Sequence, residues 1–203
     1  MSSAQYFERS PTVASERRAI TLALPDTTLA LTTDRGVFAY DAVDVGTRLL
    51  LQEAPPPPAN GDMLDLGCGY GPIALTMARR APQATVWAVD VNERALALCA
   101  QNATANGLLH VRAVTPDQVP DDVRFAAIWS NPPIRIGKAA LHALLDRWLG
   151  YLDDGGIAVL VVQKHLGADS LAAWLGDRGW QVERLAARHG YRVLASTRMA
   201  SPA

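Results

Sequence analysis

DMLDLGCGYG, residues 62–71, is the stretch that decides the fold, and Pro72 follows it directly. The apolar residues up to Asp65 predict a buried strand, and a proline is typical of the first turn of a helix. Three glycines, spaced G-x-G-x-G, lie between these elements, where they permit a sharp turn and let a ligand approach main-chain atoms. A tight structural turn without a ligand is the alternative interpretation.

The glycine spacing favours a ligand without phosphates. Dinucleotide-binding folds use G-x-G-x-x-G and phosphate loops end in lysine, whereas Gly67, Gly69 and Gly71 follow neither pattern. Pro72 also removes one N–H group that a pyrophosphate at a helix start would use. Asp65, at the end of the strand, could accept hydrogen bonds from a cationic amine.

Strands and helices alternate after this stretch. Continuous apolar runs predict strands and amphipathic runs predict helices. The predicted helices cover 72–80, 93–106, 139–151 and 169–175, and the predicted strands cover 84–90, 108–114, 124–130 and 155–163, with 180–186 and 191–197 as an antiparallel pair. Such alternation indicates an α/β fold with a mostly parallel sheet covered by helices on both faces.

The first third of the chain has a different pattern. Two short β-branched runs around Pro25-Asp26-Thr27 predict a hairpin, and Asp44 is a plausible N-cap for a short helix through residues 49–51. Four consecutive prolines, Pro55 to Pro58, predict a stiff extended connector. We therefore divide the chain into an appendage (1–54), a connector (55–60) and a ligand-binding catalytic domain (61–203).

Composition limits the classes of function. The 203 residues carry a formal net charge of −1, so a nucleic-acid partner would need a local basic patch. The two cysteines predict neither a disulfide framework nor a zinc site, and the four histidines have no ligand spacing, so we expect no metal. The sequence suggests no signal peptide and no membrane span, which favours a cytoplasmic protein.

Two further strand ends carry polar side chains. Asp90 ends the strand that follows the glycine loop, where an acid can accept both hydroxyls of a ribose, although it could instead cap the next helix. Asn92 could serve as that cap. Asn131, Pro132 and Pro133 end another strand. Because the carboxyl ends of parallel strands meet at one edge of the sheet, we expect these residues to lie close together.

The Asn-Pro-Pro turn suggests the chemistry. Two prolines fix the backbone, so that the Asn131 side-chain oxygen and the Pro132 carbonyl form a pair of acceptors. An exocyclic amine on a base is a weak nucleophile, and two acceptors on its hydrogens would orient its lone pair towards an electrophilic methyl group. The positive charge developing on nitrogen would be stabilised by these dipoles, so no strong base is needed. A plain turn is the alternative.

At these residues the chain resembles the class I S-adenosylmethionine-dependent methyltransferases, and more narrowly the small-subunit ribosomal RNA guanine-N2 methyltransferase (RsmC-like) family. The matching segments are YFERSPTV, TTDRGVFAYDAVDVGTRLLL, DLGCGYGPIAL, AVDVNERAL, NPPIRIGK, VVQKHLGADSL and HGYRVL. The resemblance implies a Rossmann-like fold, with a seven-stranded, mostly parallel sheet, an antiparallel C-terminal pair and a small N-terminal β-hairpin unit. It also implies S-adenosylmethionine as cofactor and RNA, within rRNA or the small ribosomal subunit, as partner.

The resemblance and the residues themselves together predict roles for individual residues. The expected cofactor contacts are Asp65, Gly67, Gly69, Gly71, Asp90, Asn92, Asn131 and Thr47. The expected catalytic residues are Asn131, Pro132 and Pro133, and the expected substrate contacts are Ile134, Arg135, Lys138 and Phe38. Amino-methylating enzymes often carry an aromatic residue after the prolines, whereas this chain has Ile134. Phe38, Tyr40 and Trp129 are the candidates to supply a ring, with core packing as the alternative for each. Arg135 and Lys138 directly follow the acceptor loop, and we expect them to contact RNA phosphates. A solvated helix start is the alternative.

Two other functions use related features. Methylation of a protein glutamine amide employs the same Asn-Pro-Pro chemistry, but those enzymes favour tyrosine where this chain has Ile134. A non-catalytic cofactor-binding protein in ribosome assembly is the second alternative, and the intact acids, glycines and Asn131 argue against it. The oligomeric state and the RNA target are not predicted.

Overall fold

The computed structural model describes residues 10–198, so the start of the YFERSPTV segment lies outside the described residues. Its helices are α1 (Val45–Glu53), α2 (Pro72–Arg80), α3 (Glu93–Ala105), α4 (Lys138–Leu149) and α5 (Ala168–Gly176), with short 3-10 turns at Ile134–Ile136 and Lys164–Leu166. Its strands are β1 (Arg17–Ala23), β2 (Thr28–Asp34), β3 (Asp62–Leu66), β4 (Thr85–Val89), β5 (Val111–Val114), β6 (Phe125–Ser130), β7 (Leu152–Gln163), β8 (Trp180–Arg188) and β9 (Tyr191–Arg198).

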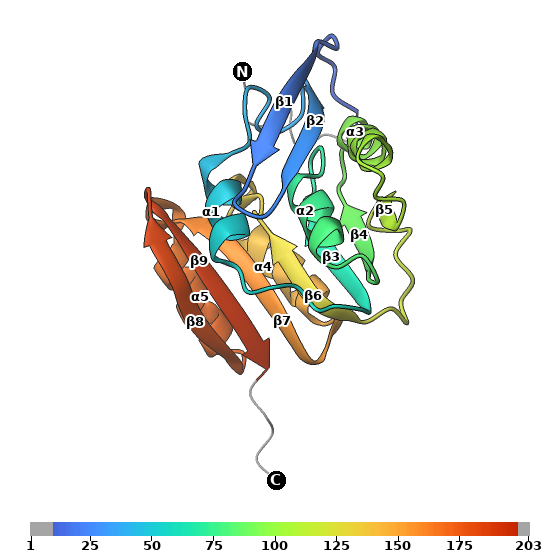
Figure 1. Cartoon of the computed structure of the whole chain (residues 1–203). Helices are drawn as coiled ribbons and strands as arrows, with labels where there is room; N and C mark the ends of the chain where they lie inside the picture. Colours follow the sequence, from blue (N-terminus) through green and yellow to red (C-terminus); the bar gives the residue numbers. More distant parts are fainter. Residues whose placement is uncertain (1–9, 199–203) are drawn as a thin grey trace.

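A seven-stranded sheet forms the centre of the molecule (Figure 1). Its strand order is β5-β4-β3-β6-β7-β9-β8, in which β5 to β7 are parallel and β9 is antiparallel to both β7 and β8. The hairpin β1–β2 forms a separate two-stranded sheet. The predicted α/β fold class, with its antiparallel C-terminal pair and N-terminal hairpin, is therefore confirmed.

Two apolar clusters cover the two faces of the sheet, because successive strand residues point to opposite sides. In β3, Met63 belongs to one cluster, whereas Leu64 and Leu66 belong to the other. The first cluster contains side chains from α1, α2 and α3, and the second contains side chains from α4 and α5. Figure 1 shows the same division, with α4 and α5 behind the sheet.

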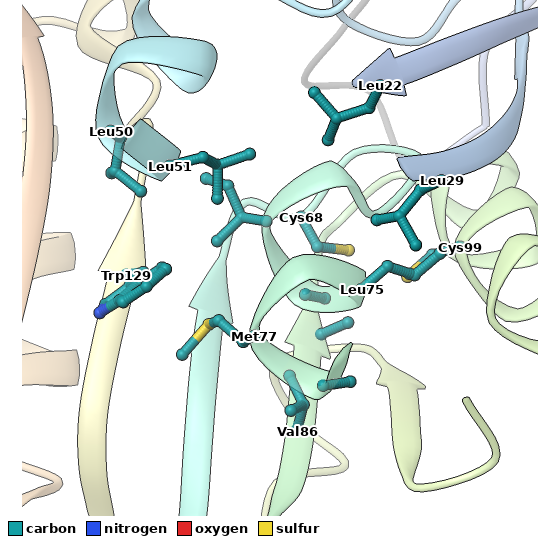
Figure 2. Packing of buried hydrophobic residues seen from close by; sticks show 14 of the residues in the cluster. Leu22, Leu29, Leu50, Leu51, Cys68, Leu75, Met77, Val86, Cys99 and Trp129 are labelled. Carbon is teal, nitrogen blue, oxygen red and sulfur yellow. The ribbon is translucent and has the colours of Figure 1, made fainter. Parts of the chain in front are cut away.

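The N-terminal hairpin and α1 share the first cluster with the sheet. Figure 2 shows Leu22 and Leu29 of the hairpin beside Leu75 of α2, with Leu50 of α1 close to Trp129 of β6. All five of these side chains are fully buried. Residues 55–58, the four prolines, form neither helix nor strand and lead from α1 to the start of β3. The hairpin β1–β2 and α1 are thus packed directly against α2, the helix that follows the glycine loop.

Asn102 of α3 fastens the hairpin to the glycine loop. Its Oδ1 accepts from the Thr32 N–H at 2.8 Å, and its Nδ2 donates to the carbonyls of Thr32 at 2.9 Å and Tyr70 at 2.8 Å. The side chain therefore pairs with the β2 backbone as a neighbouring strand would, and it holds Tyr70 through the same amide.

We expect Asn102→Ala to lower the free energy of unfolding by about 2–4 kcal/mol, because it leaves the buried Tyr70 carbonyl and the partly buried backbone groups of Thr32 without partners. Urea denaturation followed by tryptophan fluorescence measures this loss. Gln101→Ala, at the exposed neighbouring position of the same helix, is the matched control and should change stability little. A loss below about 1 kcal/mol for Asn102→Ala would contradict the assigned role.

Candidate active site

The expected site lies at the carboxyl ends of β3 and β6. These two strands are neighbours in the sheet, but the chain leaves β3 towards β4 on one side and leaves β6 towards β7 on the other. Such a reversal of strand order opens a crevice where ligands bind in open α/β sheets. A cleft at this edge is lined by Phe38, Ala39, Asp44, Thr47, Gly67, Cys68, Gly69, Tyr70, Pro72, Ile73 and Asn131.

The three glycines of the loop have different surroundings. All three have positive φ angles, at 77° for Gly67, 54° for Gly69 and 95° for Gly71. A Cβ atom on Gly67 or Gly69 would meet no heavy atom within 4 Å, so both face open space. A Cβ atom on Gly71 would lie 2.7 Å from the Cys99 Sγ atom. We therefore assign Gly71 to the packing of α2 against α3, whereas the backbone at Gly67 and Gly69 is open to a ligand.

Asp65 is fully buried under the loop and is not among the residues that line the cleft. Its Oδ2 accepts from the Ala74 N–H in the first turn of α2 at 2.8 Å, and its Oδ1 has no partner among the described residues. Burial raises the pKa of this carboxyl to about 8, and the nearby Asp90 charge acts in the same direction. A positive charge placed close to Oδ1 would favour the ionised form.

Asp90 fixes the glycine loop relative to α3. One carboxylate oxygen accepts from the Gly69 N–H at 2.9 Å and the other accepts from the Asn92 N–H at 2.9 Å. Burial raises its pKa. Each oxygen retains a second lone pair, so the predicted binding of ribose hydroxyls remains compatible with these bonds.

Asn92 is the N-cap of α3. Its Oδ1 accepts from the N–H groups of Arg94 and Ala95, and its Nδ2 donates to the Gly36 carbonyl. The side chain is 1% exposed. We therefore assign Asn92 to helix capping rather than to the predicted cofactor contact, which leaves Asp90 as the polar side chain at the end of β4.

Asn131 follows β6 directly and lines the cleft, and one of its side-chain polar atoms has no partner within residues 10–198. Its Nδ2 donates to Oδ2 of Asp44 at 3.0 Å and to Oγ1 of Thr47 at 3.0 Å. Both N–H groups of the amide are thereby used, so Oδ1 is the atom left to bind a ligand in the cleft. This is the acceptor that the sequence predicts. Thr47, a predicted cofactor contact, lines the same cleft and supports Asn131.

The two prolines form a tight turn after Asn131. Pro133 has φ −74° and ψ 73°, the values of an inverse γ-turn, and the Ile134 N–H donates to the Pro132 carbonyl at 2.8 Å. That bond occupies one lone pair of the Pro132 carbonyl and leaves one for an acceptor amine. The predicted pair of acceptors therefore consists of one fully free oxygen and one that is shared.

The predicted substrate residues separate into two groups. Phe38 is 49% exposed at the cleft, close to the site of Asn131, whereas Ile134 packs against the apolar cluster of α4 and α5. Trp129 is fully buried and the Tyr40 hydroxyl donates to Glu16, and of the three candidate rings Phe38 is the one that lines the cleft. Arg135 and Lys138 are exposed at the turn and at the start of α4.

Three further residues join the site that the sequence did not assign to it. Asp44, predicted only as a helix cap, binds Asn131, and Tyr191 donates its hydroxyl to Oδ1 of Asp44 at 3.4 Å. Tyr70 lines the cleft with a buried hydroxyl that has no partner among the described residues, and burial raises its pKa. Tyr191 could have been found from the sequence, because it belongs to HGYRVL, one of the segments that match the RsmC-like family.

Residues 10–198 contain no group of three or more histidine, cysteine, aspartate or glutamate side chains that could hold a metal ion. Within the same range, every helix is too short or too polar to cross a membrane.

Three features define a class I methyltransferase. They are the strand order of the sheet, the glycine loop after β3 and the Asn-Pro-Pro turn after β6. The methyltransferase small domain family model matches residues 28–195. The chain belongs to this family, and it is an S-adenosylmethionine-dependent methyltransferase. The open space at Gly67 and Gly69 fits that cofactor.

Relatives of known name cover the chain to different extents. The uncharacterized protein YbxB of Bacillus subtilis is 34% identical over 97% of this chain and 100% of its own length. Ribosomal RNA small subunit methyltransferase C of Shewanella oneidensis is 32% identical over 77% of this chain but only 46% of its own length. The chain thus spans about half the length of the methyltransferase C relatives it matches.

Among solved structures, the fold is similar to that of the T. thermophilus 16S rRNA N2 G1207 methyltransferase (RsmC) in complex with AdoMet and guanosine. The TM-score is 0.73 at 24% sequence identity, over 93% of this chain and 52% of that one. The shared architecture agrees with the strand order described above.

Proposed function

We propose that this enzyme transfers a methyl group from S-adenosylmethionine to an exocyclic amino nitrogen of an RNA base, and specifically to guanine N2 in small-subunit rRNA. The observation that carries the proposal is the orientation of Asn131, whose two N–H groups bind Asp44 and Thr47 and leave Oδ1 free in the cleft. The names of the methyltransferase C relatives, and the guanosine bound to the T. thermophilus enzyme, support this choice of acceptor.

S-adenosylmethionine, when bound, supplies a methyl group on a positively charged sulfur. Asn131 Oδ1 and the second lone pair of the Pro132 carbonyl accept the two N–H groups of the base amine, which directs the nitrogen lone pair at the methyl carbon. As the carbon–nitrogen bond forms and the carbon–sulfur bond breaks, the positive charge passes to nitrogen, where the two oxygens stabilise it through hydrogen bonds already formed. The nitrogen then loses one proton to water. Phe38 stacks on the base plane, in the role that Ile134 does not fill because it packs on the core.

Transfer of radiolabel from S-adenosylmethionine tests the acceptor. The substrates are small ribosomal subunits, naked 16S rRNA and ribosome-free protein extract, all from a strain lacking the gene. Label in RNA, identified as N2-methylguanosine by mass spectrometry of digested nucleosides, supports the proposal. Label in protein alone would favour the glutamine-amide reaction, and cofactor binding without transfer to any substrate would favour the non-catalytic alternative.

Arg135 and Lys138 are proposed to bind RNA phosphates beside the acceptor turn. Among the described residues neither side chain forms an ion pair, and both are exposed. We expect the double variant Arg135→Gln with Lys138→Gln to lower the slope of log K against log[salt] for RNA binding by about 1.5, because each lost phosphate contact removes about 0.7.

Filter binding at several salt concentrations measures this slope. Arg112→Gln, on the exposed edge of the sheet at β5, is the matched control and should leave the slope unchanged. An unchanged slope in the double variant would remove both residues from the RNA contact.

A further inference from the structure

Asp44 connects three parts of the fold at the start of α1. Its Oδ2 accepts from the Asn131 side chain at 3.0 Å and from the Thr47 N–H at 3.1 Å, so the same oxygen caps the helix and holds the amide. Its Oδ1 accepts from the Tyr191 hydroxyl at 3.4 Å. The carboxylate therefore lies between the helix start, the end of β6 and the start of β9.

Tyr191 is itself fixed from two sides. Gln163, its partner in the β7–β9 register, donates from Nε2 to the tyrosine oxygen at 2.7 Å. A Cβ atom on Gly46 would lie 2.6 Å from Cε1 of the tyrosine ring, so only glycine at that position lets the ring lie against the helix start. Burial raises the pKa of Tyr191, and the Asp44 carboxylate adds to this. The hydroxyl therefore keeps its proton and donates a hydrogen bond to Asp44.

The Asn131 amide can adopt two orientations, and its hydrogen-bond partners select between them. The oxygen and nitrogen ends of an asparagine side chain are almost the same size, so a half-turn about its last bond would present N–H groups to the acceptor amine. An ionised carboxylate only accepts hydrogen bonds, whereas the Thr47 hydroxyl can donate or accept. Asp44 is therefore the partner that requires the nitrogen end of Asn131 to face it. Its negative charge also polarises the amide and strengthens Oδ1 as an acceptor.

We propose that Asp44, held by Tyr191, is a positioning residue that fixes the orientation in which Asn131 presents its side-chain oxygen to the acceptor nitrogen. This inference rests on the proposed role of Asn131 in amine methylation. It goes beyond that role, because it makes the α1 cap and the start of β9 determinants of the rate of transfer rather than of cofactor binding alone.

Kinetics of three variants test the proposal. Asp44→Asn keeps a good N-cap side chain but gives Asn131 a partner that also donates. We expect kcat to fall by about 10- to 100-fold with KM for the RNA within about threefold, because alignment is lost while binding is kept. Tyr191→Phe keeps the ring on Gly46 and should lower kcat by about 3- to 10-fold.

The double variant should be no slower than Asp44→Asn alone, since both changes act through the same carboxylate. Asp41→Asn, an exposed acid in the same segment that pairs with Arg18, is the matched control and should leave kcat unchanged. Multiplicative losses in the double variant, or a rise in KM with kcat preserved, would overturn the positioning role.

A second readout does not depend on the acceptor. The Asn131 side-chain amide gives two proton resonances in a ¹⁵N-labelled sample, assigned by their absence from Asn131→Ala. In the wild type we expect slow exchange and a downfield shift for the proton that faces Asp44, and both should be lost in Asp44→Asn. Unchanged amide resonances in Asp44→Asn would overturn the inference. If the wild type instead methylates no RNA, the proposed function fails while this measurement still tests the Asp44–Asn131 contact.

Discussion

Asn131→Ala should lower kcat for methyl transfer by about 10²- to 10³-fold, the loss typical of removing one preorganised group that stabilises charge in the transition state. The substitution removes the free Oδ1 of the cleft and leaves the amine bound by the shared carbonyl of Pro132 alone. The glycine loop and Asp90 lie on other strands, so the affinity for S-adenosylhomocysteine should stay within about threefold. Single-turnover transfer of radiolabel and calorimetric titration measure the two quantities.

Asn60→Ala is the control for this prediction, because Asn60 is exposed and lies just before the amino end of β3, at the opposite edge of the sheet from the cleft. It should leave both turnover and cofactor affinity unchanged. Unaltered turnover in Asn131→Ala would remove Asn131 from the reaction. A loss of cofactor affinity as large as the loss of turnover would mean that the side chain serves the cofactor instead.

The elements of this fold could be predicted because their signals are local. Pro72 starts α2, the helix that the sequence places at 72–80, and the Asn106-Gly107 pair follows the end of α3. The central strands β3, β4 and β6 were equally clear, since their apolar runs are buried on both faces of the sheet. The edge strand β5 is only partly buried and begins at Val111 rather than at residue 108. Alternation of these elements then limits the topology to a few arrangements, of which the doubly wound sheet is one.

The support of Asn131 could not be predicted in the same way. Asp44 and Tyr191 are 147 residues apart, and their contact depends on the β7–β9 register that pairs Tyr191 with Gln163. The roles of the glycines also depend on tertiary packing. Gly67 and Gly71 belong to one motif, but Cys99 of α3 lies where a side chain of Gly71 would be, and nothing lies there for Gly67.

The stability of the free enzyme should fall as pH rises from about 5 to 8, with Asp65 as a main cause. Its carboxyl has a pKa of about 8 in the folded state, against an ordinary value of 3.8. Between these values the folded protein keeps the proton and the unfolded chain does not, so the unfolded state binds fewer protons. The free energy of unfolding therefore decreases, by up to about 1.4 kcal/mol per pH unit, and the contribution of Asp65 levels off above pH 8.

Urea denaturation at several pH values measures this slope, and Asp65→Asn is the test variant because an amide does not titrate. The variant should show a clearly shallower decrease between pH 5 and 8 than the wild type. Asp62→Asn, at the other end of β3, where Asp62 accepts from the Trp87 indole, is the matched control and should keep the wild-type slope. Identical slopes for the wild type and Asp65→Asn would show that Asp65 is ionised in the free enzyme.

We expect binding of the cofactor to release the proton that Asp65 carries in the free enzyme. The sequence predicts that the Asp65 carboxylate accepts from the cationic amine of the ligand, and Oδ1 is the Asp65 oxygen that has no partner within residues 10–198. A positive charge placed there lowers the pKa of Asp65, so binding at pH 7 should release about one proton. Calorimetric titration with S-adenosylmethionine in two buffers of different ionisation enthalpy measures that release. In Asp65→Asn the release should disappear. If the wild-type binding heat does not depend on the buffer, cofactor binding does not change the protonation of Asp65. The role of Asp65 would then be limited to its hydrogen bond with the Ala74 N–H in the first turn of α2.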